Sequence, residues 1–291
     1  MKRLRPSELI ASMRRWVQFA LFRDGWFSAR QLVPNFFTLL SICAGLLAIR
    51  WAIEREFEWS IAAIVIAAIL DALDGRMARI LHAQSKFGAE FDSLADFVSF
   101  GVAPAILLFN WGLFRLDGAG WVAVTALALA CGVRLARFNA TVERERLAWE
   151  EDYLTGVPAP AGAIIVMLPL YLDGLRSFTD PALPGLTQPV WAPWAVLVYT
   201  VSVALLMVST IPTYAGKATG DRIARNYPMA FLVVLAALTW LLLRYPYATL
   251  ATGTAVYFGL MPLGVRRFLR LTKLVTDDEE LGATYSRNAG E

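Results

Sequence analysis

The sequence predicts an all-α integral membrane protein with about eight transmembrane helices and an N-terminal amphipathic helix at the membrane surface. Three observations predict this fold class: an apolar composition, apolar runs as long as a bilayer is thick, and an uneven placement of Lys and Arg. Hydrophobic residues make up 57% of the 291 residues and charged residues only 18%, whereas a soluble domain has about 25% charged residues. This composition argues against a soluble enzyme, and we expect the lipid bilayer, not a nucleic acid, as a partner.

The apolar runs give the positions of the predicted helices. A helix needs about 20 mostly apolar residues to cross a hydrocarbon core of about 30 Å. Runs of this kind occur at 33–53, 57–80, 91–114, 120–138, 159–173, 190–208, 228–244 and 248–265. The fifth run is the shortest, and the chain shows no internal repeat.

The placement of Lys and Arg predicts the orientation of these helices. Short cytoplasmic connections are enriched in positive charge. If the N-terminus lies inside, most cations fall in the two terminal segments and in the connections between spans 2 and 3, 4 and 5, and 6 and 7. The exceptions are Arg50, Arg55, Arg115, Arg176 and Arg244. We therefore expect a protein of the cell (inner) membrane with both termini in the cytoplasm.

The two ends of the chain differ from the middle. Before the first span, apolar residues from Leu9 to Leu21 recur at helical spacing while Arg14, Arg15 and Arg23 take other faces, which predicts a helix on the inner leaflet. The alternative is a solvated basic tail. After the last span, a basic stretch is followed by an acidic tail, which we expect to be disordered. The predicted divisions are 1–32 at the interface, 33–217 as the catalytic membrane domain, 218–265 as two further helices, and 266–291 as the tail.

Carboxylates are the residues best suited to carry chemistry in this chain. Cys43 and Cys131 lie inside apolar runs and His82 is the only histidine, which excludes a disulfide framework and a site built from several histidines. By contrast, a stretch of 26 residues, which runs from the second span into the third, contains four aspartates. Charged residues at membrane depth are costly and usually mark a function.

The four aspartates form two pairs with helical spacing. Asp71 and Asp74 lie near the inner end of one predicted helix, and Asp92 and Asp96 lie near the start of the next. Residues three or four apart share one face of a helix. Converging carboxylates in a medium of low dielectric constant repel one another unless cations bind or protons neutralise some of them. Divalent cations with oxygen ligands fit this arrangement.

Glycine and arginine residues near the aspartates add a second indication. Gly75 and Gly88 have no Cβ, so a phosphate can approach closely, and Arg79 offers a planar cation to it. Together these residues suggest phosphoryl transfer on a lipid-linked diphosphate at the inner membrane surface. The alternative is a self-neutralising network in which the four aspartates pair with Arg76, Arg79 and Lys86.

The segment from Asp71 to Asp96 satisfies the pattern D-x2-D-G-x2-A-R-x8-G-x3-D-x3-D, and so resembles the CDP-alcohol phosphatidyltransferase family. Four stretches look like the branch of that family that makes phosphatidylserine. They are DSLADFVSFGVAPA from Asp92, RLARFN from Arg134, GVPAPAG from Gly156 and PTYAGK from Pro212. The resemblance covers most of residues 33–217.

The resemblance implies that a phosphatidyl group moves from CDP-diacylglycerol to the hydroxyl of L-serine, with release of CMP. It implies two divalent cations, Mg²⁺ or Mn²⁺, bound by Asp71, Asp74 and Asp92. Asp96, also close to a metal, would be the general base. The family pocket for CDP-diacylglycerol corresponds here to Asp74, Gly75, Ala78, Arg79 and Gly88. The resemblance also implies a homodimer.

Three residues at the inner end of the fourth span and directly after it are candidates for binding serine: Arg134, Arg137 and Asn139. An arginine fork matches a carboxylate with two parallel hydrogen bonds. The alternative is that these residues are ordinary cytoplasmic cations at the membrane surface.

Other functions remain open at this point. Within the same chemistry, the acceptor could be choline, glycerol 3-phosphate or inositol phosphate. A cation-coupled transporter also places aspartates in membrane helices. An inactive scaffold is a third alternative, although all four aspartates are present. The polar residues gather at one surface rather than on both sides of the midplane, which favours the enzyme.

Overall fold

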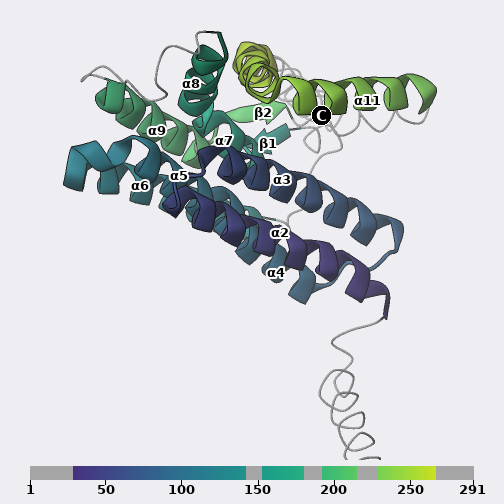
Figure 1. Ribbon diagram of the computed structural model, residues 1–291. Helices are drawn as coiled ribbons and strands as arrows, with labels where there is room; N and C mark the ends of the chain where they lie inside the picture. Colours follow the sequence, from purple (N-terminus) through teal and green to yellow (C-terminus); the bar gives the residue numbers. More distant parts are fainter. Residues whose placement is uncertain (1–28, 142–152, 180–191, 215–227, 267–291) are drawn as a thin grey trace, which may run out of the picture. The chain divides into compact units, whose positions relative to one another are not determined.

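The structure is a computed structural model, which describes residues 29–141, 153–179, 192–214 and 228–266 (Figure 1). These residues are almost entirely helical. The α-helices are α2 (Ala29–Ile53), α3 (Phe57–Ile80), α4 (Lys86–Asp96), α5 (Ala103–Trp111), α6 (Asp117–Thr141), α7 (Ala159–Val166), α8 (Leu168–Thr179), α9 (Ala192–Val208) and α11 (Pro228–Arg244). A further helix covers Pro246–Arg266. The π-helix η1 (Phe97–Val102) and the 3-10 helix η2 (Leu113–Leu116) complete the helical part.

The all-α fold class is confirmed, and every predicted span overlaps a helix. Five helical stretches are long and apolar enough to cross a membrane: Leu32–Ile53, Lys86–Trp111, Leu113–Ala140, Ala159–Arg176 and Pro246–Arg266. The apolar stretches Ala192–Val208 and Leu232–Arg244 are shorter. Helix α3 has 24 residues but carries charged side chains in its last turns. The predicted number of eight crossings therefore stays a prediction, and the N-terminal amphipathic helix and acidic tail lie outside the described residues.

The described residues form two compact units, which adjoin in the sequence between Ala103 and Pro104. In the first unit, α2 and α3 pack along each other, and α4 with η1 packs on α2 (Figure 1). The contact between α2 and α3 is made of small buried residues such as Ala48 and Ala67. Small side chains let two helices approach closely, which is how helices associate where no hydrophobic effect drives them together.

Buried hydroxyls hold these helices in register. The Ser60 hydroxyl donates to the Ala48 carbonyl at 2.8 Å, and the Ser41 hydroxyl donates to the Ala67 carbonyl at 3.2 Å. The Ser99 hydroxyl of η1 donates to the Ser41 carbonyl at 3.1 Å. A Cβ on Gly45 would collide with Ser99, so this glycine permits the close approach of α2 and η1.

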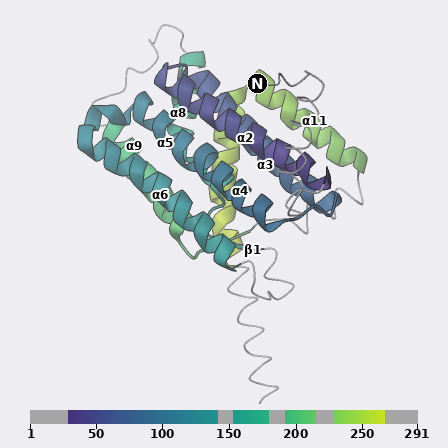
Figure 2. The same cartoon turned by 90° about the horizontal axis from the view of Figure 1, so that it is seen from below.

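In the second unit, α6 and α9 lie along each other (Figure 2), and α7 packs on α9. Two short strands, β1 (Tyr153–Thr155) and β2 (Pro212–Tyr214), pair antiparallel, with Tyr153 opposite Tyr214. This pair could not be predicted from the sequence, because three-residue strands are too short to show an alternating pattern. Strand β1 directly precedes the stretch from Gly156, and β2 forms the start of the stretch from Pro212; both stretches carried part of the family resemblance.

The fifth predicted span is a broken helix. Helix α7 ends at Val166 and α8 begins at Leu168, so the break falls just before Pro169. Proline has no N–H group, and the Ile165 carbonyl therefore loses the helical partner four residues further on. The Tyr199 hydroxyl of α9 donates to this carbonyl at 2.8 Å. A side chain from a neighbouring helix thus compensates the break, as a chain in lipid requires.

Candidate functional site

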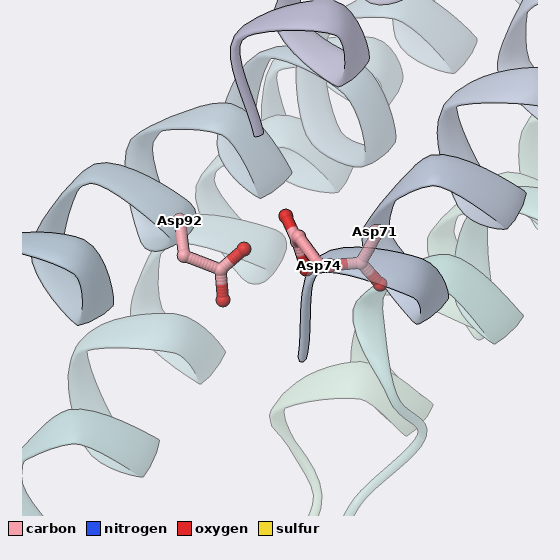
Figure 3. Close-up of side chains that lie close together, drawn as sticks. All are labelled: Asp71, Asp74 and Asp92. Carbon is pink, nitrogen blue, oxygen red and sulfur yellow. The ribbon is translucent and has the colours of Figure 1, made fainter. Parts of the chain in front are cut away.

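Three of the four motif aspartates meet in the first unit. Asp71 and Asp74 lie one turn apart on α3, and Asp92 points toward them from α4 (Figure 3). One carboxylate oxygen from each residue lies within 4.8 Å of the others. Asp74 is buried, whereas Asp71 and Asp92 are partly exposed. The two helices therefore bring three oxygen ligands to one point.

The connection between α3 and α4 produces this geometry. The chain turns at His82, which has a left-handed backbone φ of 48°. Ser85 then begins α4 by accepting a hydrogen bond from the Gly88 N–H at 3.0 Å, which is the N-cap arrangement. Because the connection is short, Asp92 falls on the second turn of the returning helix, opposite the end of α3.

The three residues Asp71, Asp74 and Asp92, called the trio below, have the features of a cation-binding site. Asp92 Oδ1 is buried and has no hydrogen-bond partner among the described residues. Nor do Asp74 and Asp92 form an ion pair with Arg76, Arg79 or Lys86 in the part of the chain that the structure describes. A buried carboxylate oxygen without a partner is costly unless a cation binds it. Asp74 and Asp92 thus take no part in a self-neutralising network with these cations, and the donor set of carboxylate oxygens fits a hard divalent cation.

Asp96 stands apart from this trio. It ends α4, one turn beyond Asp92, and is not a member of the group of three. The π-helical turn η1 follows it directly, with the Ala103 N–H donating to the Val98 carbonyl five residues earlier. Such an extra residue in a helix often marks a functional position.

The remaining pocket residues of the motif have different surroundings. Gly75 has open space where a Cβ would stand, which fits the expected approach of a phosphate beside Asp74. A Cβ on Gly88 would instead lie 3.1 Å from Ser85 Oγ and 3.4 Å from Asn35 Oδ1, so this glycine serves close packing. The Arg79 guanidinium donates through Nε to the Gly75 carbonyl at 3.2 Å. Ala78 lies between them on the same helix.

Thr38, which lies outside the aspartate motif, also contacts the trio. The Thr38 hydroxyl of α2 donates to Asp74 Oδ2 at 2.8 Å, and Thr38 is 4% exposed. A signal was present in the sequence: Asn35, Thr38 and Ser41 recur every three residues in a run that is otherwise apolar. Polar residues on one face of a membrane helix commonly point toward another helix.

The candidate serine residues lie on α6 in the second unit. Arg134 is 9% exposed. The Arg137 guanidinium donates from Nη1 to the Val208 carbonyl at 2.7 Å and from Nη2 to the Ser209 carbonyl at 3.1 Å. These carbonyls end α9, where a cation compensates the partial negative charge of the helix terminus. Arg137 therefore ties α6 to the end of α9, and Asn139 follows in the last turns of α6.

The fold and the site define a helical protein of the membrane-spanning type with an acidic centre suited to divalent cations. The chain belongs to the CDP-alcohol phosphatidyltransferase family, whose model matches residues 31–186. This match contains the whole aspartate motif and the candidate residues of α6, and it ends before α9, α11 and the helix Pro246–Arg266.

Relatives with curated names support the same assignment. A CDP-diacylglycerol–serine O-phosphatidyltransferase of Mycobacterium bovis is 38% identical over 252 residues, which cover 86% of this chain and 84% of the relative. Proteins of the same name from Helicobacter pylori and Methanocaldococcus jannaschii are also similar. The first is 38% identical over 62% of this chain and 70% of its own length. The second is 32% identical over 65% of this chain and 90% of its own length.

Proposed function

We propose that this chain is a CDP-diacylglycerol–serine O-phosphatidyltransferase, which moves a phosphatidyl group to L-serine and releases CMP. The observation that carries the proposal is the trio of Asp71, Asp74 and Asp92 with a buried, unpartnered Asp92 oxygen. The names of the relatives support serine as the acceptor rather than choline, glycerol 3-phosphate or inositol phosphate. Membership of this family also argues against the alternative of a cation-coupled transporter.

In this proposal the aspartates hold two divalent cations, Mg²⁺ or Mn²⁺, with Asp96 close to one of them. Such ions would neutralise the diphosphate oxygens as charge develops on them during the reaction. Gly75 leaves the space for the diphosphate beside Asp74, and Ala78, Arg79 and Gly88 complete the pocket for CDP-diacylglycerol.

Asp96 acts as the general base of the proposed reaction. Its carboxylate takes the proton of the serine hydroxyl, whose oxygen forms a bond to the phosphorus that carries diacylglycerol. The bond from this phosphorus to the oxygen bridging to CMP breaks, and CMP leaves. Arg134 and Asn139, with Arg137, bind the serine carboxylate. Among these, Arg134 ranks first, since Arg137 already donates two hydrogen bonds to the end of α9.

The membrane arrangement is part of the proposal. The chain lies in the cell membrane, with 33–217 as the catalytic domain and 218–265 as two further helices. Both termini and the site face the cytoplasm, so serine and the nucleotide reach the site from water while the acyl chains stay in lipid. The protein is a homodimer.

The test is release of CMP by the purified protein in detergent, with CDP-diacylglycerol, Mg²⁺ or Mn²⁺, and each acceptor in turn. We expect release with serine and loss of release on adding EDTA. Release with another acceptor in place of serine would contradict the proposed acceptor. No release with any acceptor, from protein that melts cooperatively, would contradict the proposed activity itself.

A further inference from the structure

We propose that Thr38, on the first membrane helix, is a positioning residue that orients the Asp74 carboxylate for cation binding. This inference rests on the proposed function. It brings a third helix, α2, into a centre that the aspartate motif places on α3 and α4 alone.

The hydrogen bond at Thr38 has one proton and two acceptors within reach. The hydroxyl lies 2.8 Å from Asp74 Oδ2 and 3.2 Å from the Pro34 carbonyl of its own helix. The carboxylate is both the nearer acceptor and the charged one, and hydrogen bonds to charged acceptors are the stronger. The proton therefore belongs to the bond with Asp74.

The surroundings make this bond effective. Thr38 and Asp74 are each 4% exposed, so water does not compete for the carboxylate oxygen. A hydrogen bond to Oδ2 restricts rotation of the carboxylate about its Cβ–Cγ bond, which fixes the direction of the other oxygen. Groups that hold a metal ligand in this way commonly change metal affinity when they are removed.

Packing one turn further along α2 fixes the position of Thr38 itself. The Ser41 hydroxyl donates to the Ala67 carbonyl of α3 at 3.2 Å and is also buried. Ser41 thus holds the same two helices together, but its partner is a backbone carbonyl instead of an aspartate. It provides a matched control for the loss of a buried hydroxyl.

The experiment compares Thr38→Val, Thr38→Ser and Ser41→Ala in the full-length protein in detergent. Binding of Mn²⁺ is measured by electron paramagnetic resonance without substrate, and CMP release is measured as a function of Mn²⁺ concentration. Valine keeps the shape of threonine and removes the donor, so we expect Thr38→Val to weaken Mn²⁺ binding roughly 10-fold or more. Thr38→Ser keeps the hydroxyl and should bind Mn²⁺ as the wild type does, and so should Ser41→Ala.

Two results would overturn the inference. The first is unchanged Mn²⁺ affinity in Thr38→Val, and the second is an equal loss in Ser41→Ala, which would show that a buried hydroxyl matters only for packing. If Thr38→Val does not fold, Thr38→Ala replaces it, with the same expected loss. If the wild type binds Mn²⁺ and releases CMP, and Thr38→Val does both equally well, then only the role of Thr38 is refuted. A wild type that does neither refutes the proposed function as well.

Discussion

The surroundings of Asp92 indicate that this site is suited to bind cations. Its Oδ1 atom is buried without a hydrogen-bond partner among the described residues, and it lies close to two other carboxylates. In the absence of cations, this arrangement costs free energy through desolvation and repulsion. If the proposed cations bind, this oxygen would be one of their ligands. We therefore expect Asp92 to lower stability when no cation is bound.

The change Asp92→Asn separates these two effects. In EDTA we expect the variant to melt at the same temperature as the wild type or higher, because an unpaired charge is removed. With Mn²⁺ we expect the wild type to be stabilised and the variant to be stabilised much less, with CMP release reduced by about 100-fold or more. Thermal melting with and without Mn²⁺ provides the measurement. Glu90→Gln removes an exposed carboxylate two residues away and serves as the control; a similar loss there would argue against a specific role of Asp92.

Two arginines of α6 allow binding of serine to be separated from support of the fold. Arg137 donates two hydrogen bonds to the end of α9, so Arg137→Ala should lower the melting temperature in addition to raising the KM for serine. Arg134→Ala should raise the KM for serine much more than the KM for CDP-diacylglycerol, because an arginine fork binds a carboxylate. Thermal melting distinguishes the two variants, and steady-state kinetics with each substrate varied in turn gives the KM values. Equal effects of Arg134→Ala on both KM values would remove it as the serine ligand.

Two helical stretches are interrupted, one by a break between α7 and α8 and the other by the π-helical turn η1. At the break between α7 and α8, the Ile165 carbonyl accepts a hydrogen bond from the Tyr199 hydroxyl of α9. The π-helical turn after Asp96 changes which residues of the third predicted span face the same way before and after it. The first interruption is compensated by another helix, and the second directly follows Asp96.

Two tyrosines in the second unit test the compensation at Pro169. Tyr199→Phe removes the donor to the Ile165 carbonyl and should destabilise the protein by about 0.6 to 1.7 kcal/mol, the range for hydrogen bonds between membrane helices. Tyr171→Phe is the matched control. Its hydroxyl is buried without a hydrogen-bond partner in the described ranges, so its removal should leave stability unchanged or higher. Denaturation of both variants in detergent gives the comparison. A loss in Tyr171→Phe equal to that in Tyr199→Phe would contradict the assignment.

For the whole molecule, the central question is the side of the membrane on which the aspartates lie. The aspartates stand at the α3–α4 end of the first unit, whereas the connection from α2 to α3 lies at the other end of α3. The distribution of Lys and Arg predicts that the first of these ends is cytoplasmic.

Labelling of single cysteines tests this orientation. In a chain with Cys43→Ser and Cys131→Ser, the changes Glu56→Cys and Gln84→Cys place one thiol at each end of α3; both positions are exposed. A maleimide that cannot cross membranes should label Glu56→Cys in intact cells and should label Gln84→Cys only after the cells are opened. The reverse pattern would place the site outside and contradict access of cytoplasmic nucleotide.

The fold class, the positions of the helices and the four aspartates of the motif could be predicted from the amino-acid sequence. These features depend on composition and on spacing along single helices, which the order of residues fixes locally. The packing of the helices brings Asp71, Asp74 and Asp92 together and leaves Asp96 beyond them. The same packing forms the hydrogen bonds from Thr38 to Asp74 and from Arg137 to the end of α9. These contacts join residues far apart in the chain, and they depend on how a turn at His82, small-residue packing and broken helices direct each side chain, which spacing does not encode.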